Sequence, residues 1–256
     1  MTAPDPWSDL RRHTAARIAL GRAGVSLPTA EWLRFALAHA QARDAVHLPF
    51  DDETLASALG SHGFTALRLE SAAVDRATYL RRPDLGRRLS ARSAALLQAL
   101  PEAAHDLAVV VGDGLSARAV HEQALPLLLE LRPRLEADAV ALGAVALVRQ
   151  CRVALGDEVG ALLGARAVLV LIGERPGLSS PDSLGAYLTW APRLGRSDAE
   201  RNCVSNIRPA GQPPAEAARR IAWLLAGARR LGASGIALKD DSDASDAKGE
   251  RPHLGG

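Results

Sequence analysis

Residues 107–119 read LAVVVGDGLSARA, and this stretch decides the fold class. LAVVV, at 107–111, is a short continuous apolar run bounded by turn residues, the pattern of a strand buried on both faces. Two glycines follow at once, and a helical pattern begins near Leu115. A buried strand that turns directly into a helix is typical of an α/β protein with a mostly parallel sheet.

The alternation of strands and helices continues toward the C-terminus. Further strands are expected at 144–148, 167–172, 187–190 and 203–207. Helices are expected at 115–137, interrupted by Pro126 and Pro133, at 157–163, and at 214–231, where Ile221, Leu224, Leu225 and Ala228 share one face. Strands alternating with helices indicate a parallel sheet with helices on both faces.

Residues 1–100 read as a mostly helical unit. Helices are expected at 5–20, from Thr29 onward, from Asp51 or Asp52 to Gly60, and at 84–100, with one short strand at 64–69. The expected division is therefore a helical N-terminal domain at 1–100 and an α/β domain at 101–238. The polar stretch 239–256 is expected to be a disordered tail.

Composition excludes several classes of protein. Lys and Arg number 31 and Asp and Glu 29, so a net charge of +2 gives no reason to expect binding to nucleic acid or to a membrane. The chain has two cysteines, too few for a disulfide framework, and no apolar run long enough to span a membrane. We therefore expect a cytoplasmic protein with reduced thiols.

The turn after the first buried strand matches G-x-G-x-x-A through Gly112, Gly114 and Ala117. Such a turn can cradle a pyrophosphate at a helix N-terminus, which would suit a nucleotide-dependent oxidoreductase. A nicotinamide site also needs an acidic residue after the next strand, where this chain has RQC at 149–151. A tight strand-to-helix turn is the simpler interpretation, and both stay open.

Two later segments place polar residues near strand ends. GERPGLSSPDSLG, at 173–185, follows the strongest strand and puts Glu174 at the edge where open α/β sheets bind ligands. The alternative for Glu174 is a surface ion pair with Arg175. RNCVSNIRP, at 201–209, brings Cys203 into a strand, where a lone cysteine is more often a small apolar residue than a nucleophile.

The remaining polar residues and motifs do not indicate a catalytic or metal site. The basic cluster at 79–92 could meet phosphates or an acidic partner, although a solvated helix is simpler. No grouping of histidines and cysteines has metal-ligand spacing, and no Walker or nucleophile-elbow motif is present. We assign no catalytic residue and no metal ligand.

Taken in order, the segments of this chain resemble the light chain of ethanolamine ammonia-lyase. The resemblance runs from Asp9 to about Ile236 and is carried by RPDLGRRL, VVVGDGLSARAV, GERPGLSSPDSLG and NCVSNIRP. It implies a small helical N-terminal domain followed by a Rossmann-like, mostly parallel sheet with helices on both faces.

The resemblance also implies a function. Enzymes of this family convert ethanolamine to acetaldehyde and ammonia by a radical route that uses adenosylcobalamin. A TIM-barrel large subunit holds the substrate, and the small subunit covers the cobalamin at the interface, in a hetero-oligomer of paired heterodimers. The matched cofactor contacts are Val153, Glu174 and Cys203. This chain alone is therefore expected to be inactive.

Two features of the chain differ from patterns in related enzymes, and one alternative function lies outside the enzymes. The chain has no D-x-H-x-x-G segment, so a base-on cofactor is expected. Its short N-terminus argues against packaging in a bacterial microcompartment, which longer relatives use. A non-catalytic binding protein, descended from a light chain that lost its cofactor, is the alternative outside the enzymes.

Overall fold

The computed structural model describes residues 5, 7–14, 16–101 and 105–243. One six-stranded sheet organises them, with the strand order β1-β3-β2-β4-β5-β6. The strands are β1 Ala66–Glu70, β2 Leu107–Gly112, β3 Leu142–Arg149, β4 Ala167–Gly173, β5 Leu184–Trp190 and β6 Arg201–Ile207. The first four strands are parallel, and β5 is antiparallel to both β4 and β6.

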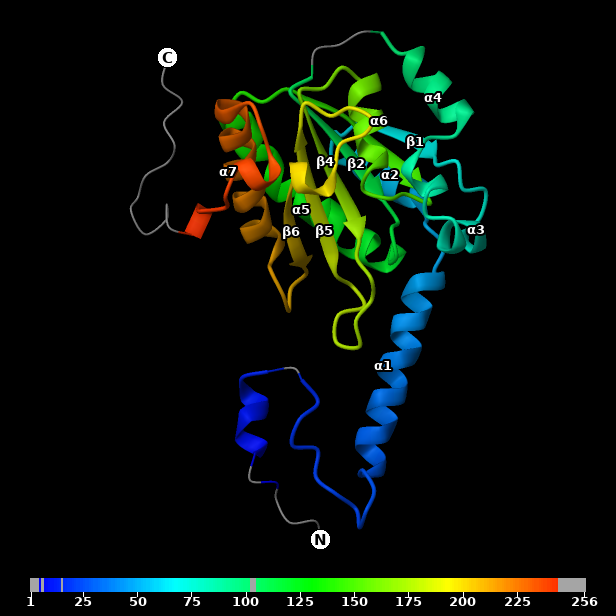
Figure 1. Ribbon diagram of the computed structural model, residues 1–256, viewed down its shortest axis with the longest axis vertical. Helices are drawn as coiled ribbons and strands as arrows, with labels where there is room; N and C mark the ends of the chain where they lie inside the picture. The colour runs from blue at the N-terminus through cyan, green and yellow to red at the C-terminus, as the bar shows by residue number, and fades with distance from the viewer. Residues whose placement is uncertain (1–4, 6, 15, 102–104, 244–256) are drawn as a thin grey trace.

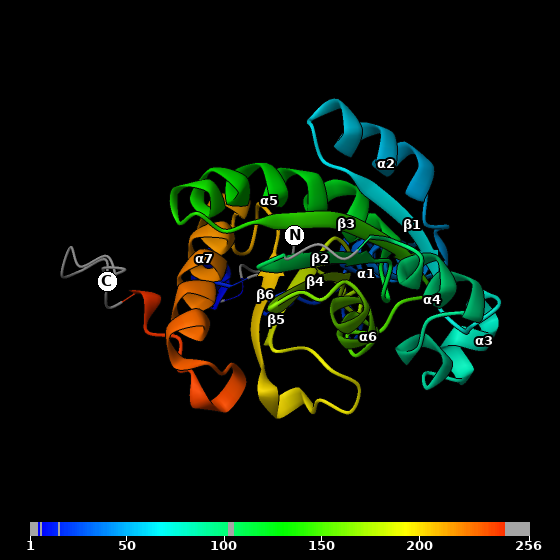
Figure 2. The same cartoon turned by 90° about the horizontal axis from the view of Figure 1, so that it is seen from above.

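Helices lie on both faces of this sheet (Figures 1 and 2). The α-helices are α1 Thr29–His47, α2 Asp52–Ser61, α3 Arg76–Arg81, α4 Ala91–Gln98, α5 Ala117–Ala137, α6 Leu155–Leu162 and α7 Pro214–Leu231. Short 3₁₀ helices are η1 Ser8–Arg12, η2 Leu85–Arg87, η3 Asp198–Glu200 and η4 Gly235–Ala237. The α/β class and the mostly parallel sheet expected from the sequence are confirmed.

The sheet separates two apolar layers. Alternate residues of β2 divide between them, with Val109 packing in the layer under α2, α5 and α7 and Val110 in the layer under α4 and α6. Every residue of β2 and β4 is buried. Burial on both faces explains why these strands read as unbroken apolar runs rather than as alternating ones.

The sheet and its core also draw on residues before 100. Strand β1 pairs in parallel with β3, from Ala66 opposite Val145 to Glu70 opposite Arg149. Phe50, Leu55, Leu59 and Phe64 belong to the same core layer as α5. The expected boundary near residue 100 therefore does not separate the sheet from the elements that precede it.

The prediction of a helix at 5–20 is wrong. In the described part of that stretch, the only helix is the five-residue η1, none of whose residues is buried. Short helices need a buried face to be stable in water, and this segment covers no core. Helix α1 is present as expected but begins after Pro28. Its C-terminal end joins the body of the sheet and its N-terminal end projects away from it (Figure 1), with Trp32 and Leu33 exposed.

Two other helix predictions need correction. The helix expected at 84–100 is split into η2 and α4, because Ser90 is extended and caps α4 by accepting a hydrogen bond from Ser93 N. The interruption expected at Pro126 and Pro133 is absent, since α5 continues through both prolines. Its buried face against the sheet and α7 offsets the hydrogen bonds that the prolines remove.

The C-terminal segment is described as far as residue 243. Asp243 meets Arg220 of α7 at 2.5 Å, and Ser242 is buried. This start of the stretch expected to be disordered therefore lies against α7. The rest of that prediction, 244–256, lies outside the described residues.

Candidate functional site

The carboxyl edge of the parallel strands is where the candidate residues gather. Strands β2, β3, β4 and β6 end at this edge, and the antiparallel β5 begins there. Helices α5 and α7 cover one face of the sheet, and α6 lies on the other (Figure 2). On the α6 side, Cys203 and Ser205 of β6 are exposed, so β5 and β6 form an open shelf there.

Glu174 directly follows β4 and reaches across the shelf. Its carboxylate accepts hydrogen bonds from Ser183 Oγ at 2.5 Å, from Ser205 Oγ at 2.6 Å and from Asn206 N at 3.3 Å. A Cβ on Gly185 would lie 2.9 Å from Glu174 Oε1, so the absence of a side chain at Gly185 lets the Glu174 carboxylate pack closely over β5. Within the described chain Glu174 has hydroxyl and backbone partners, and the ion pair with Arg175 is not formed.

Cys203 is the third residue of β6 and lies opposite Tyr187 of β5. Partial burial raises the pKa of the Cys203 thiol, the nearby Glu174 carboxylate raises it further, and a hydrogen bond with Tyr187 lowers it. Burial likewise raises the pKa of the Tyr187 hydroxyl. The thiol is therefore neutral at physiological pH, which suits packing or weak hydrogen bonding rather than nucleophilic attack.

Val153 lies in the turn between β3 and α6. It is half-buried, packs against the core layer under α6, and its carbonyl accepts a hydrogen bond from Gly156 N at 3.0 Å. In the sheet order, β2 separates β3 from β4. The structure thus joins Glu174 to the strand of Cys203 and sets Val153 farther along the same edge.

The glycine turn before α5 serves close packing. Gly114 has φ +52°, and a Cβ on it would lie 2.3 Å from Gly173 O. Leu115 N donates to that same carbonyl at 2.8 Å, and Ser116 Oγ donates to Pro181 O at 2.8 Å. The segment after β4 therefore packs against the start of α5, where a pyrophosphate would have to lie. This geometry favours the tight-turn interpretation.

Several interactions between side chains far apart in the sequence lie near the candidate site, and no sequence pattern predicts them. Arg201 of β6 holds Asp157 of α6 through two hydrogen bonds, of 2.6 and 2.7 Å, and both side chains are buried. Asp113 of the glycine turn accepts from Cys151 N at 3.0 Å and meets Arg76 at 3.3 Å. These partners lie 37 to 44 residues apart in the chain, beyond any local pattern.

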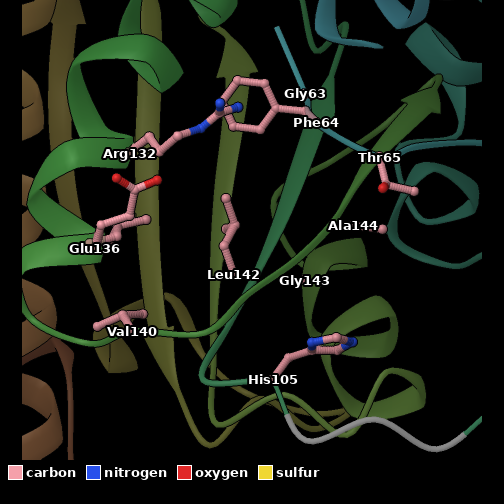
Figure 3. A pocket seen from close by; sticks show the side chains of 11 residues that line it. Gly63, Phe64, Thr65, His105, Arg132, Glu136, Val140, Leu142, Gly143 and Ala144 are labelled. Carbon is pink, nitrogen blue, oxygen red and sulfur yellow. The ribbon is translucent and has the colours of Figure 1, made fainter.

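Two further observations limit the kinds of site. Among the described residues, no three His, Cys, Asp or Glu side chains are grouped so as to hold a metal ion. A cavity of about 560 Å³ lies at the amino end of β3, the opposite edge (Figure 3). There the Arg132 guanidinium stacks 3.4 Å from the Phe64 ring centre and donates to His62 O. None of the three predicted cofactor residues lines this cavity.

No helix in the described part of the chain is both long and apolar enough to cross a membrane.

Comparison with known proteins gives a consistent family. Residues 4–239 match the family model of the ethanolamine ammonia-lyase light chain. A protein of Azotobacter vinelandii named ethanolamine ammonia-lyase small subunit is 55% identical over 253 residues, covering 97% of this chain and 94% of that protein. Proteins of the same name are 56% identical in Ralstonia nicotianae, covering 93% and 90%, and 57% identical in Bradyrhizobium diazoefficiens, covering 93% and 91%.

Proposed function

Because this chain belongs to the ethanolamine ammonia-lyase light chain family, we propose that it covers adenosylcobalamin at an interface with a large subunit. The match across residues 4–239 is the observation that carries the proposal. When bound, adenosylcobalamin supplies the radical chemistry that converts ethanolamine to acetaldehyde and ammonia. The relatives are named ethanolamine ammonia-lyase small subunits, which supports a large-subunit partner, and we propose that the two chains form a hetero-oligomer of paired heterodimers.

The shelf formed by β5 and β6 fits such a cofactor. The rim of a corrin carries amide groups, which donate and accept hydrogen bonds. The Glu174 carboxylate accepts three hydrogen bonds within the chain, and a carboxylate has about four acceptor positions, so capacity remains for an amide N–H. Gly185 has no side chain that would displace the carboxylate, since a Cβ there would lie 2.9 Å from Oε1.

The other two proposed cofactor contacts, Cys203 and Val153, lie on the same carboxyl edge of the sheet as Glu174. Cys203 offers a neutral, exposed thiol beside the Glu174 carboxylate, and Val153 offers backbone groups and an apolar side chain at the start of α6. We assign none of the three a role in acid–base or radical steps. Their proposed role is to bind and orient the cofactor, while the large subunit holds the substrate.

A reconstitution experiment tests this division of labour. Acetaldehyde release from ethanolamine and adenosylcobalamin is measured in the dark with this chain, its cognate large subunit, and the two together. We expect activity only in the mixture. Lack of activity in the mixture, with a large subunit that works with another light chain, would refute the proposed function.

The role of Glu174 is tested by cofactor binding rather than by activity alone. Glu174→Gln keeps the shape of the side chain but replaces one acceptor oxygen with an amide NH₂ and removes the charge. We expect the Kd of the assembled complex for adenosylcobalamin to rise about tenfold, as for loss of a hydrogen bond to a charged group. Glu136→Gln, an exposed change beside the cavity of Figure 3, is the matched control and should leave the Kd unchanged.

A further inference from the structure

Two arginines lie over one buried tyrosine at the edge that carries Val153. Tyr79 of α3 is fully buried, and its hydroxyl donates to Cys151 O at 2.8 Å. The guanidinium groups of Arg76 and Arg152 lie 5.0 and 4.4 Å from the centre of its ring. Arg152 N also donates to Gly86 O at 2.8 Å, so both the backbone and the guanidinium of Arg152 are held in place.

Only one of these two arginines has a carboxylate partner in the described chain. Arg76 meets Asp113 at 3.3 Å and donates to Gly114 O at 2.8 Å and to Val46 O at 2.9 Å. Arg152 forms no ion pair with any described residue, and its Nε is buried without a hydrogen-bond partner. Arg152 therefore keeps donors that no described residue satisfies.

The acidic side chains nearest to Arg152 in the sequence are engaged elsewhere. Asp157 is held by Arg201, and Glu158 accepts a hydrogen bond from Leu89 N at 2.8 Å. The exposed Arg87 and Arg88, which follow Gly86, likewise form no ion pair within the described residues. Positive charge is thus in excess beside the turn that opens α6.

The start of α6 adds to this charge. Val153 and Ala154 precede the first residue of α6, and their backbone N–H groups donate to no described acceptor. Such N–H groups and the helix dipole favour an anion, although the effect is modest beside that of a full charge. A guanidinium presents its donors in a planar fork that matches phosphate oxygens. The combination suits a phosphate group better than a neutral amide.

We propose that Arg152, together with the turn at Val153, binds the phosphodiester of adenosylcobalamin. This inference rests on the proposed function and adds one contact to it. The nucleotide loop of the cofactor contains a single phosphodiester, and the corrin amides that we assign to Glu174 carry no charge. The cofactor would then span the carboxyl edge from the β3–α6 turn to the shelf of β5 and β6.

Cobinamide provides the test, because it lacks the phosphodiester together with the nucleotide base. The Kd values of the assembled complex for adenosylcobalamin and adenosylcobinamide are measured in the dark by equilibrium dialysis with absorption detection. We expect Arg152→Gln to raise the Kd for adenosylcobalamin about tenfold or more and to change that for adenosylcobinamide less than about twofold. Arg229→Gln, at an exposed arginine of α7, is the control and should change neither value.

Three results would overturn the inference while leaving the proposed function intact. An equal loss of affinity for both ligands would show that Arg152 only supports the fold. Unchanged affinity for both ligands would show that Arg152 does not contact the phosphodiester. Weaker association of the two subunits without any cofactor, seen by sedimentation velocity, would place an acidic surface of the large subunit on Arg152. A wild-type complex that binds neither ligand would instead refute the proposed function, and this inference with it.

Discussion

At the scale of single residues, one buried ion pair joins two parts of the candidate site. Arg201 lies two residues before Cys203, and Asp157 lies four residues after Val153. Their side chains are 1% and 2% exposed, and Arg201 also donates to Thr189 Oγ1 at 2.9 Å. The pair fixes α6 against β6, so the residues at both ends of the site depend on it.

Removing one member of this pair should be costly. Asp157→Asn removes the only buried counter-charge that the described residues give Arg201 and leaves the exposed Asp198, 3.4 Å from Arg201 Nε. We expect the free energy of unfolding to fall by about 3–5 kcal/mol. Urea unfolding followed by circular dichroism measures the change. The control is Asp138→Asn at the C-cap of α5, where we expect less than about 0.5 kcal/mol. Similar values for the two variants would contradict the assigned role of the pair.

Gly114 gives a second prediction at this scale. Its positive φ and the Gly173 carbonyl, 2.3 Å from a built Cβ, both exclude a side chain. We expect Gly114→Ala to lower the free energy of unfolding by more than about 1 kcal/mol, because strain and overlap add. Gly60→Ala in α2 meets no atom within 4 Å and should be neutral or stabilising. Thermal unfolding of both variants measures the two changes, and an equal effect of the two substitutions would contradict the prediction.

At the scale of elements, α2 is joined to α5 by a histidine. Asp51 caps α2 through Thr54 N, and the backbone N–H of Asp51 donates to His121 Nε2 at 3.0 Å. The His121 ring also stacks on Phe50, with 5.6 Å between ring centres. An imidazole nitrogen that accepts a hydrogen bond carries no proton, so this link requires neutral His121.

This requirement makes the link depend on pH. Burial lowers the pKa of His121 below its ordinary 6.5, and the carboxylates of Asp51 and Glu122 oppose the shift. The unfolded chain therefore binds the proton more readily. The contribution of His121 is present above about pH 6.5 and is lost as pH falls through the lower folded value. We expect His121→Gln to lessen the fall in unfolding free energy between about pH 7 and pH 5. Parallel pH profiles for wild type and variant would disprove the link.

At the scale of the whole molecule, stability is unevenly distributed. Strands β2 and β4 are buried throughout, whereas α1 buries only Ala38 and Ala45 of its residues. Figure 1 shows α1 extending from the body of the sheet. An exposed helix of this length is marginally stable by itself, since helices gain most of their stability from packing.

Hydrogen exchange of the isolated chain should show this contrast. We expect the amides of β2 and β4 to exchange only on global unfolding and those of α1 to exchange at least about 100-fold faster. Mass spectrometry of peptic fragments measures both regions in one experiment. Equal protection of α1 and β4 would show that α1 is stabilised by contacts that the structure lacks.

Local patterns in the sequence determined the elements that are buried or capped. Two buried strands, the cap at Asp51 and the helix at Pro214–Leu231 all follow from patterns within a few residues, and the structure contains them. The predicted helix at 5–20 failed because helical spacing cannot tell whether a face finds a core to cover. The family resemblance, which rests on motifs in a fixed order, predicts Glu174 as a cofactor contact.

Tertiary structure alone decided the relations between distant segments. The pairing of β1 with β3, the Asp157–Arg201 ion pair and the stacking of Arg152 on Tyr79 each join residues that no local pattern relates. Hydrophobic periodicity specifies which face of an element is buried but not which partner buries it. Which side chains meet depends on how the elements pack, so the arrangement of the candidate site is set by the assembled sheet and not by local sequence.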